Sequence, residues 1–259
     1  MIGIFDSGVG GLTVLATALK ILPNEDFIYF GDSKNAPYGI KSKSEVIKLS
    51  KNICDKLIKK YNVKAIVIAC NTATSAAIDI LRKHYNIPIV GMEPAIKPAL
   101  EDKDTKQTLV LATEMTLKEK KYKTLLKSLK NDQKIINKPC SKLVKSIENV
   151  EFNFDKVNKI VDKCIDSYQN IDSIVLGCTH FLFIKSYLLE KYSFKIFDGN
   201  LGTILNLKNI LKENNNLDIS NRNRKVIIKN SGNNKKNKLS KKLLEIYIGE
   251  INEGYRNIN

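Results

Sequence analysis

Short apolar runs alternate along the chain with longer amphipathic stretches, and this alternation is typical of an α/β protein with largely parallel sheets. The apolar runs predict strands at Ile2–Phe5, Phe27–Phe30, Ala65–Ala69, Ile87–Val90, Thr108–Ala112, Ser173–Leu176, Lys195–Phe197 and Val226–Ile228. The amphipathic stretches predict helices at Leu12–Leu22, Ser44–Tyr61, Ala73–Tyr85, Leu117–Lys130, Lys156–Gln169, Phe183–Tyr192, Gly202–Glu213 and Lys238–Asn252. Two polar, Asn-rich stretches predict loops at Asn214–Arg224 and Asn230–Asn237.

An internal repeat with an offset of 108 residues organises this pattern. The segment Ala65–Thr72 aligns with Ser173–His180, and Gly91 then falls on Gly199 without a gap. A looser similarity aligns the first strand with Leu109–Ala112. Each copy consists of a strand, a cysteine, a polar pair, a helix and a strand. We therefore expect two similar α/β units that face each other across a tight interface.

Composition narrows the class of protein. The 259 residues are 43% hydrophobic, and no apolar run approaches the roughly 20 residues that a membrane span requires. The N-terminal residues Met1–Asp6 resemble a core strand rather than a signal peptide. The five cysteines are odd in number and form no C-x-x-C pair, which favours free thiols in a reducing cytoplasm over a disulfide framework or a zinc site.

The chain is strongly basic, with a formal net charge of +16. One interpretation is an anionic partner, such as nucleic acid, an anionic surface or a small acidic substrate. The other is a general excess of lysine that only solvates helical faces, as in the lysine-rich stretch Lys118–Lys130. The scattered positions of the lysines favour the second interpretation.

Two of the cysteines, Cys70 and Cys178, occupy equivalent positions in the repeat. Each ends an apolar strand and opens a polar turn into a predicted helix, and parallel sheets bind ligands beyond the carboxyl ends of their strands. A helix N-terminus lowers the pKa of a thiol, so both sulfurs are expected to be reactive. Asn71, Thr72 and Thr179 are predicted to cap these helices and to present polar groups to a carboxylate.

If the two units face each other, the two thiols enter one cleft from opposite sides. Racemisation at a carbon acid uses such a pair, because one group removes a proton from one face and the other returns a proton to the opposite face. The sequence contains no pyridoxal phosphate motif, metal-ligand cluster, Walker loop or G-x-G-x-x-G, so no cofactor and no metal are predicted. Cys54 and Cys164 lie within amphipathic helices and are interpreted as inert core residues.

Asp6 and His180 are candidate helpers of the two thiols. His180 follows Cys178 by two residues and is either its proton-transfer partner or a capping histidine. Asp6 ends the first strand, directly before Ser7-Gly8-Val9-Gly10-Gly11. That position suits either a catalytic helper or an ordinary helix cap followed by a tight glycine turn.

Five motifs together resemble the bacterial glutamate racemases, in the same order from residue 1 to about residue 200: Asp6-Ser7-Gly8-Val9-Gly10-Gly11, Pro37-Tyr38-Gly39, Cys70-Asn71-Thr72-Ala73, Glu93-Pro94-Ala95-Ile96-Lys97-Pro98-Ala99 and Gly177-Cys178-Thr179-His180. The resemblance implies two pseudo-symmetric α/β domains with the active site in the cleft between them. The first domain would comprise residues 1–96 and 209–259, to which the C-terminal helix returns, and the second residues 97–208. The resemblance also implies a homodimer that interconverts L- and D-glutamate for peptidoglycan synthesis.

By the same resemblance, Cys70 takes the α-proton of D-glutamate with the help of Asp6. Cys178 takes the α-proton of L-glutamate with the help of His180. Glu148 falls where the family has a functional acidic residue, in surroundings that match less well. The residues implied to hold the substrate are Asp6, Ser7, Tyr38, Gly39, Asn71, Thr72, Thr113, Thr116, Thr179 and His180.

The chain departs from the family pattern at several positions. It has no Arg before the Pro-Tyr-Gly turn, Leu182 stands where a proline commonly follows the His-aromatic pair, and Lys145 replaces a proline before Glu148. About fifty residues at the C-terminal end match poorly. Two alternatives stay open. One is an aspartate racemase or another cofactor-free isomerase of the same fold, and the other is a basic protein that contacts nucleic acid or DNA gyrase as a second role.

Overall fold

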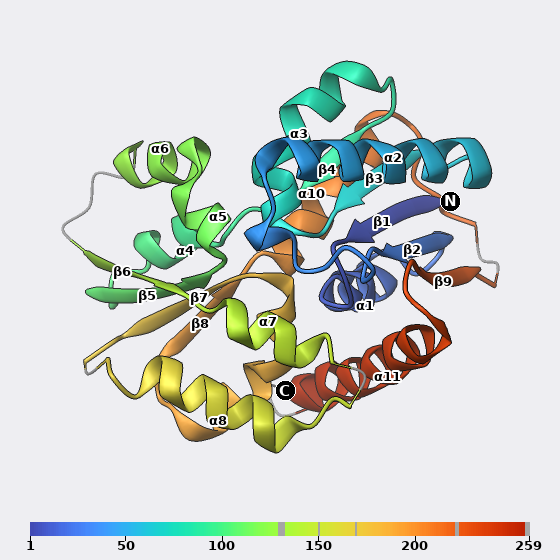
Figure 1. The fold of residues 1–259 in the computed structure, drawn as a ribbon. Helices are drawn as coiled ribbons and strands as arrows, with labels where there is room; N and C mark the ends of the chain where they lie inside the picture. The colour runs from blue at the N-terminus through green and yellow to red at the C-terminus, as the bar shows by residue number, and fades with distance from the viewer. Residues whose placement is uncertain (129–132, 150, 169, 221–222, 257–259) are drawn as a thin grey trace.

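The structure is a computed structural model that describes residues 1–128, 133–149, 151–168, 170–220 and 223–256. In these residues, two sheets are surrounded by helices (Figure 1). The strands are β1 (Ile2–Asp6), β2 (Phe27–Gly31), β3 (Ala65–Ile68), β4 (Ile89–Gly91), β5 (Gln107–Ala112), β6 (Lys134–Pro139), β7 (Ser173–Gly177), β8 (Lys195–Asp198) and β9 (Val226–Asn230). The helices are α1 (Leu12–Ile21), α2 (Lys43–Tyr61), α3 (Asn71–His84), α4 (Ile96–Glu101), α5 (Glu114–Lys118), α6 (Lys120–Ser128), α7 (Ser141–Ile147), α8 (Phe154–Ile165), α9 (Lys185–Lys191), α10 (Asn200–Glu213) and α11 (Asn234–Arg256), with 3-10 turns η1 (Tyr38–Ile40) and η2 (Thr179–Ile184).

The two sheets repeat one topology. Among the described residues, the five-stranded sheet has the order β4-β3-β1-β2-β9 and the four-stranded sheet the order β6-β5-β7-β8. Every pairing between neighbouring strands is parallel. When the second sheet is followed from its other edge, β8-β7-β5-β6 matches β4-β3-β1-β2. The predicted α/β fold with two parallel sheets is therefore confirmed, and the strand order reproduces the sequence repeat.

The central strands are apolar and covered on both faces, as parallel strands usually are. β1, β3 and β7 are buried along their whole length. One apolar cluster contains Ile4 and Val67 of the first sheet together with Leu111 and Ile174 of the second. The two sheets therefore share a continuous core, which fixes the positions of the loops at their carboxyl ends relative to one another.

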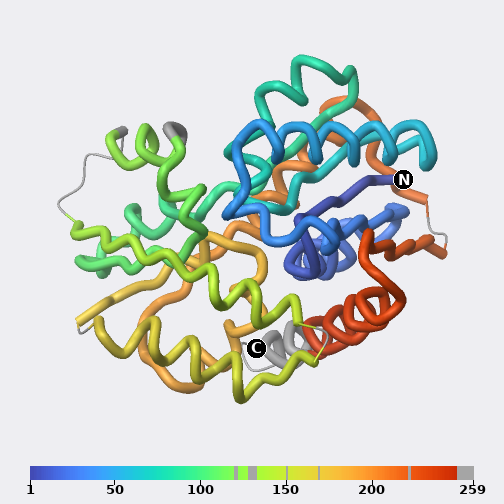
Figure 2. Tube along the Cα trace, in the orientation of Figure 1, coloured from blue at the N-terminus to red at the C-terminus, as the bar shows by residue number. Residues whose placement is uncertain are grey.

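The C-terminal segment returns to the first sheet. β9 pairs with β2 at the sheet edge, and α10 and α11 both pack against α1. Figure 2 shows the red part of α11 leading away from β9 and passing close to the α1 region. This packing supports a domain that joins residues 1–96 to the C-terminal segment. The domain boundaries stay a prediction, and the boundary after residue 208 falls inside α10.

Several elements differ from the prediction. The sequence pattern predicts no strand at β6 and no helix at α4 or α7. The predicted helix Leu117–Lys130 is divided into α5 and α6, because the backbone of Glu119 is extended. Its predicted end, like the end of the predicted helix Lys156–Gln169, lies outside the described residues. The predicted loop Asn230–Asn237 contains the start of α11. No helix in the described part of the chain has both the length and the apolar character that a membrane span needs.

Candidate active site

Four loops come together at the carboxyl ends of the central strands. In each sheet the strand order reverses between two neighbours, β1 and β3 in the first and β5 and β7 in the second. Ligands of open parallel sheets bind beyond the strands at such a reversal point. Asp6 ends β1, Cys70 follows β3, Thr113 follows β5 and Cys178 follows β7. The repeat therefore places the two cysteines at matching positions of the two sheets.

Cys70 is connected to a buried carboxylate through one hydroxyl group. Its thiol donates to Ser7 Oγ at 3.5 Å, and Ser7 Oγ donates to Asp6 Oδ1 at 3.5 Å. Asp6 Oδ1 also accepts the backbone N–H of Gly8 at 2.9 Å. Burial is the main cause that raises the pKa of Asp6 above its ordinary value. The sulfur of Cys70 in turn accepts the N–H of Ala73 at 3.4 Å and so caps α3.

Cys178 is connected to a second buried carboxylate through an imidazole. Its sulfur lies 3.7 Å from His180 Nδ1, and His180 Nε2 lies 2.7 Å from Glu148 Oε1. Glu148 Oε1 also accepts the N–H of Val9 at 2.5 Å, and Oε2 accepts a hydrogen bond from Ser33 Oγ at 2.9 Å. The carboxylate at the end of α7 is thus held by loops that follow β1 and β2.

The contacts of Glu148 and His180 favour the charged forms of both groups. Burial alone raises the pKa of Glu148, but the hydrogen bond and charge of His180 and the charge of Lys236 lower it to about 2. Burial alone lowers the pKa of His180, but hydrogen bonds to Cys178 and Glu148 raise it well above 6.5. These contacts therefore favour the protonated form of the imidazole beside the sulfur of Cys178.

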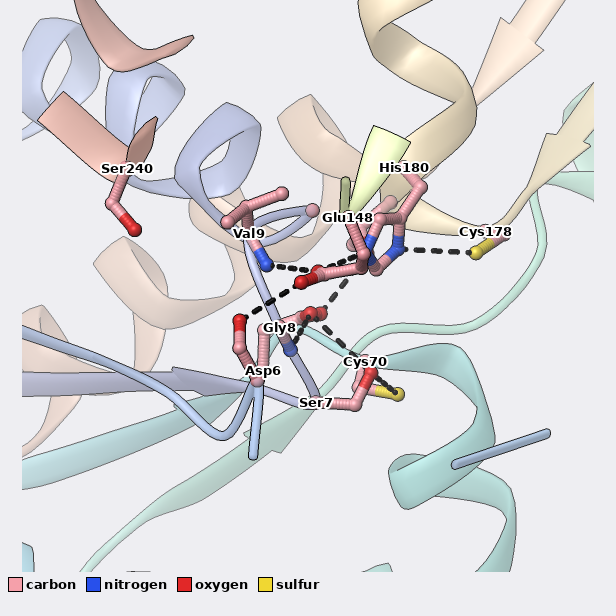
Figure 3. A network of polar contacts seen from close by, with 12 residues as sticks. Asp6, Ser7, Gly8, Val9, Cys70, Glu148, Cys178, His180 and Ser240 are labelled. Carbon is pink, nitrogen blue, oxygen red and sulfur yellow. Dashed lines mark hydrogen bonds and ion pairs between the residues drawn. The ribbon is translucent and has the colours of Figure 1, made fainter. Parts of the chain in front are cut away.

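The polar contacts that begin at Cys70 (the Cys70 arm) and those that begin at Cys178 (the Cys178 arm) are joined to each other. Thr179 Oγ1 donates to Asp6 Oδ2 at 3.0 Å, so the residue after Cys178 contacts the acid that is connected to Cys70 through Ser7. Figure 3 shows Cys70 and Cys178 in one neighbourhood, at separate ends of the polar contacts around Asp6 and Glu148. The two cysteines are only 6% and 7% exposed. The site is therefore nearly closed to solvent.

Three threonines connect the two halves of the molecule beside Cys70. Thr72 Oγ1 lies 2.9 Å from Thr113 Oγ1 and 3.5 Å from Thr116 Oγ1, and the last two atoms are 2.9 Å apart. Gly39 packs against this cluster, because a Cβ there would lie 2.8 Å from Thr113 Cβ. Asn71 begins α3 and is buried. The structure therefore gathers these predicted substrate-binding residues near the same strand ends.

Residues 12–203 match the model of a protein family described as Asp/Glu/Hydantoin racemase. The chain belongs to this family. Glutamate racemases of Clostridium botulinum strain Alaska E43 and Clostridium novyi are 48% and 49% identical to it, over 94% and 95% of this chain and 96% and 97% of their own lengths. The crystal structure of a glutamate racemase isoform from Bacillus anthracis is similar with a TM-score of 0.82 at 29% identity, covering 96% of this chain and 94% of that one. A glutamate racemase from Francisella tularensis, in complex with D-glutamate, has a TM-score of 0.77 at 31% identity, with coverages of 94% and 93%.

Two sequence-based expectations about Cys70 and Cys178 are wrong. The pKa of Cys70 is raised rather than lowered, because burial and the nearby charge of Asp6 outweigh the N–H of Ala73 at the start of α3 and raise the pKa to about 12. Cys178 opens the 3-10 turn η2 rather than an α-helix, and α9 begins only at Lys185. The expected capping groups differ as well. The sulfur of Cys70 caps α3, and Thr179 donates to Asp6 instead of capping a helix.

The remaining cysteines lie outside the network described above. Cys54 is buried in α2, where burial raises its pKa to about 12. Cys140 and Cys164 have their sulfurs 2.7 Å apart, and Cys164 is partly exposed, so it is not an inert core residue as predicted. In the part of the chain that the structure describes, no group of three or more His, Cys, Asp or Glu side chains is arranged to hold a metal ion.

Three residues that are not predicted from the sequence contact the predicted site residues. Asp32 accepts a hydrogen bond from the predicted site residue Tyr38, whose Oη lies 2.7 Å from Asp32 Oδ2. Ser33 and Lys236 both contact Glu148. Asp32 and Ser33 follow β2 directly, so the rule that ligands bind at the carboxyl ends of strands could have found them. No local signal marks Lys236, which reaches the site from α11.

Proposed function

We propose that this chain interconverts L- and D-glutamate with Cys70 and Cys178 as two acid/base groups and with no cofactor. The observation that carries the proposal is that each thiol has its own buried acid, Asp6 for Cys70 and Glu148 for Cys178, in one connected network. The relatives at 48% and 49% identity support glutamate as the substrate, because both are named glutamate racemases. The D-glutamate complex of the Francisella tularensis relative supports the same substrate.

In the L-to-D direction, the thiolate of Cys178 removes the α-proton from one face of the substrate. The thiol of Cys70 then delivers its proton to the opposite face, so one C–H bond breaks and another forms. The two sulfurs exchange protonation states, and the D-to-L direction starts from Cys70. Burial, with the charge of Asp6, raises the pKa of Cys70 to about 12, which favours the thiol form that the L-to-D step requires.

The groups around the sulfurs are assigned supporting roles in this proposal. The imidazolium of His180 stabilises negative charge at Cys178, and Asp6 takes up or returns a proton at Cys70 through Ser7 Oγ. Polar groups at the strand ends would bind the two carboxylates and the amine of the substrate. These binding residues are Asp6, Ser7, Tyr38, Gly39, Asn71, Thr72, Thr113, Thr116, Thr179 and His180.

The small exposure of the two sulfurs has a consequence for the reaction cycle. Substrate reaches them only when the surrounding loops separate, and closure then excludes water from the deprotonated intermediate. A cavity of about 780 Å³, lined by residues of α1, β8 and α10, lies apart from the polar network. It is not the substrate site of this proposal.

The cellular setting is part of the same proposal. A homodimer in the cytoplasm would supply D-glutamate for peptidoglycan, and the free state of all five cysteines supports a reducing compartment. Light scattering tests the dimer. DNA binding that weakens steeply with salt would support the second role suggested by the net charge of +16, and binding that is absent or independent of salt would remove it.

The activity is tested with purified protein and L-glutamate in deuterated water, without pyridoxal phosphate. We expect loss of optical rotation together with uptake of α-deuterium. Cys70→Ser and Cys178→Ser should each lower turnover about 10²- to 10⁴-fold, the range typical of acid/base groups. Cys54→Ala, a buried thiol outside the network, is the control and should retain turnover. Full turnover in either serine variant would refute its assigned role, and faster exchange of L-aspartate would favour an aspartate racemase.

A further inference from the structure

The C-terminal helix places a cation on the far side of Glu148 from His180. Lys236 Nζ lies 3.0 Å from Glu148 Oε2 and also donates to the backbone carbonyl of Glu148. The side chain of Lys236 is 17% exposed and that of Glu148 is 9% exposed, so the ion pair is largely removed from water. Lys236 lies in the first turn of α11, where the helix dipole disfavours a cation. The contact with Glu148 therefore offsets a position that is locally unfavourable.

The carboxylate of Glu148 is shared between two cations. Oε1 lies 2.7 Å from His180 Nε2, and Oε2 lies 3.0 Å from Lys236 Nζ. The orientation of the carboxylate does not depend on Lys236 alone. The N–H of Val9 also holds Oε1, and the hydroxyl of Ser33 also holds Oε2. Removal of the lysine charge is therefore expected to change the electrostatics of the pair more than its geometry.

We propose that Lys236 is a positioning residue that balances the charge of Glu148 and thereby sets how tightly His180 holds its proton beside Cys178. This role rests on the function proposed above, in which His180 acts on Cys178. It assigns a task in the active site to the C-terminal segment, which lies beyond the residues 12–203 that match the family model.

The direction of the effect follows from simple electrostatics. A carboxylate that is already paired with one cation attracts a proton on a second cation less strongly than an unpaired carboxylate does. Without Lys236, the whole charge of Glu148 would act on the imidazolium of His180, and the proton would be harder to release. The other titratable groups that face this pair are acids from three elements, Asp6 of β1, Tyr29 of β2 and Cys178 after β7. These three residues are the same in the Lys236 variants, so a difference in the titration of His180 is assigned to the lysine.

Histidine NMR measures this effect directly, because the chain contains only two histidines, His84 and His180. His84 is exposed at the end of α3 and serves as an internal reference. In Lys236→Met we expect the titration midpoint of His180 to rise by about one pH unit, with that of His84 unchanged. Lys236→Arg keeps the charge and should keep the midpoint of the unmodified chain. Lys241→Met, an exposed lysine on the same helix, is the matched control and should change neither histidine.

An unchanged or lowered His180 midpoint in folded Lys236→Met would overturn the proposal, and so would a raised midpoint in Lys236→Arg. Lys236→Gln removes the charge but keeps a donor for the Glu148 carbonyl, and the same criterion applies to it if the methionine variant does not fold. The alkaline limb of the pH profile of kcat/KM, where His180 loses its proton, should move upward by about the same amount as the NMR midpoint. The titration needs no substrate. Absence of racemase activity in the unmodified chain would therefore refute the proposed function without deciding the NMR result.

Discussion

Gly10 offers a direct test of how accurately His180 and Thr179 must be positioned. A Cβ at Gly10 would lie 2.5 Å from His180 Nδ1 and 2.5 Å from Thr179 Oγ1, whereas ordinary contacts begin at 3.4 Å. Gly10→Ala therefore displaces these atoms by about 0.9 Å, at a cost in stability of about 1–3 kcal/mol for overpacking. A misplacement of about 1 Å near reacting groups lowers rates about 10²-fold, and we expect kcat/KM to fall by about that factor.

Gly202→Ala is the matched control for this substitution. Gly202 belongs to α10, and a Cβ there would meet no atom within 4 Å. Alanine is favoured over glycine in a helix by about 1 kcal/mol, so this variant should unfold at slightly higher urea and keep full activity. Polarimetry of glutamate gives the rate, and urea unfolding gives the stability of both variants. A Gly10→Ala protein with undiminished kcat/KM would refute the reasoning, because the positions of His180 and Thr179 would then not limit the reaction.

Three further outcomes follow from other contacts. Iodoacetamide at pH 8 should alkylate Cys164, because the Cys140 thiol and two nearby lysines lower the pKa of Cys164 to about 7. Racemase activity should change little, and mass spectrometry locates the label. Inactivation in step with this labelling would contradict the prediction. Lys64→Met should lower the free energy of unfolding in urea by about 3 kcal/mol, because the buried carboxylate of Glu25 loses its cation. A loss no larger than the loss caused by replacing an exposed lysine would count against this prediction. The unfolding free energy lost in His180→Asn should be largest between pH 4.5 and 6.5, where the ion pair of His180 and Glu148 is fully formed in the folded chain. The loss should become smaller at higher pH, as the raised pKa of His180 is passed, and also in acid, as the pH approaches the pKa of about 2 of Glu148. A loss that does not vary with pH would refute the charged pair.

Most strands are predictable because parallel strands that are buried on both faces are continuous apolar runs. β6 is the exception, since it is an edge strand whose side chains are partly exposed and whose sequence is KIINKP. The repeat contains the missing information. An offset of 108 residues carries β2, Phe27–Gly31, onto residues 135–139, which lie within β6. The repeat therefore indicates this edge strand, although the apolar pattern of the segment does not.

The positions of the central site residues are predictable for the same reason, because Asp6 ends the apolar strand β1 and the two cysteines, Cys70 and Cys178, follow the apolar strands β3 and β7. Their ionisation is not. The helix N-terminus at Cys70 is evident from the sequence, but the burial that dominates the pKa of this thiol in the folded chain is not. The contact between Glu148 and Lys236 joins residues 88 positions apart. Such a contact depends on how α7, which packs against α8 and η2, lies relative to α11, which packs against α1 and β9. No local pattern contains that information.

The two arms of the site share a backbone plan but differ in charge. The Cys70 arm ends in one acid, Asp6, whereas the Cys178 arm contains the acid Glu148 and the two cations His180 and Lys236. When all four groups carry their formal charges, the set is neutral, and a neutral buried set costs less to desolvate than an unbalanced one. Cys178 has His180 as its polar neighbour, whereas burial and the charge of Asp6 raise the pKa of Cys70. A repeated fold thus gives two thiols in chemically different surroundings, and the difference arises from side chains that the repeat does not duplicate.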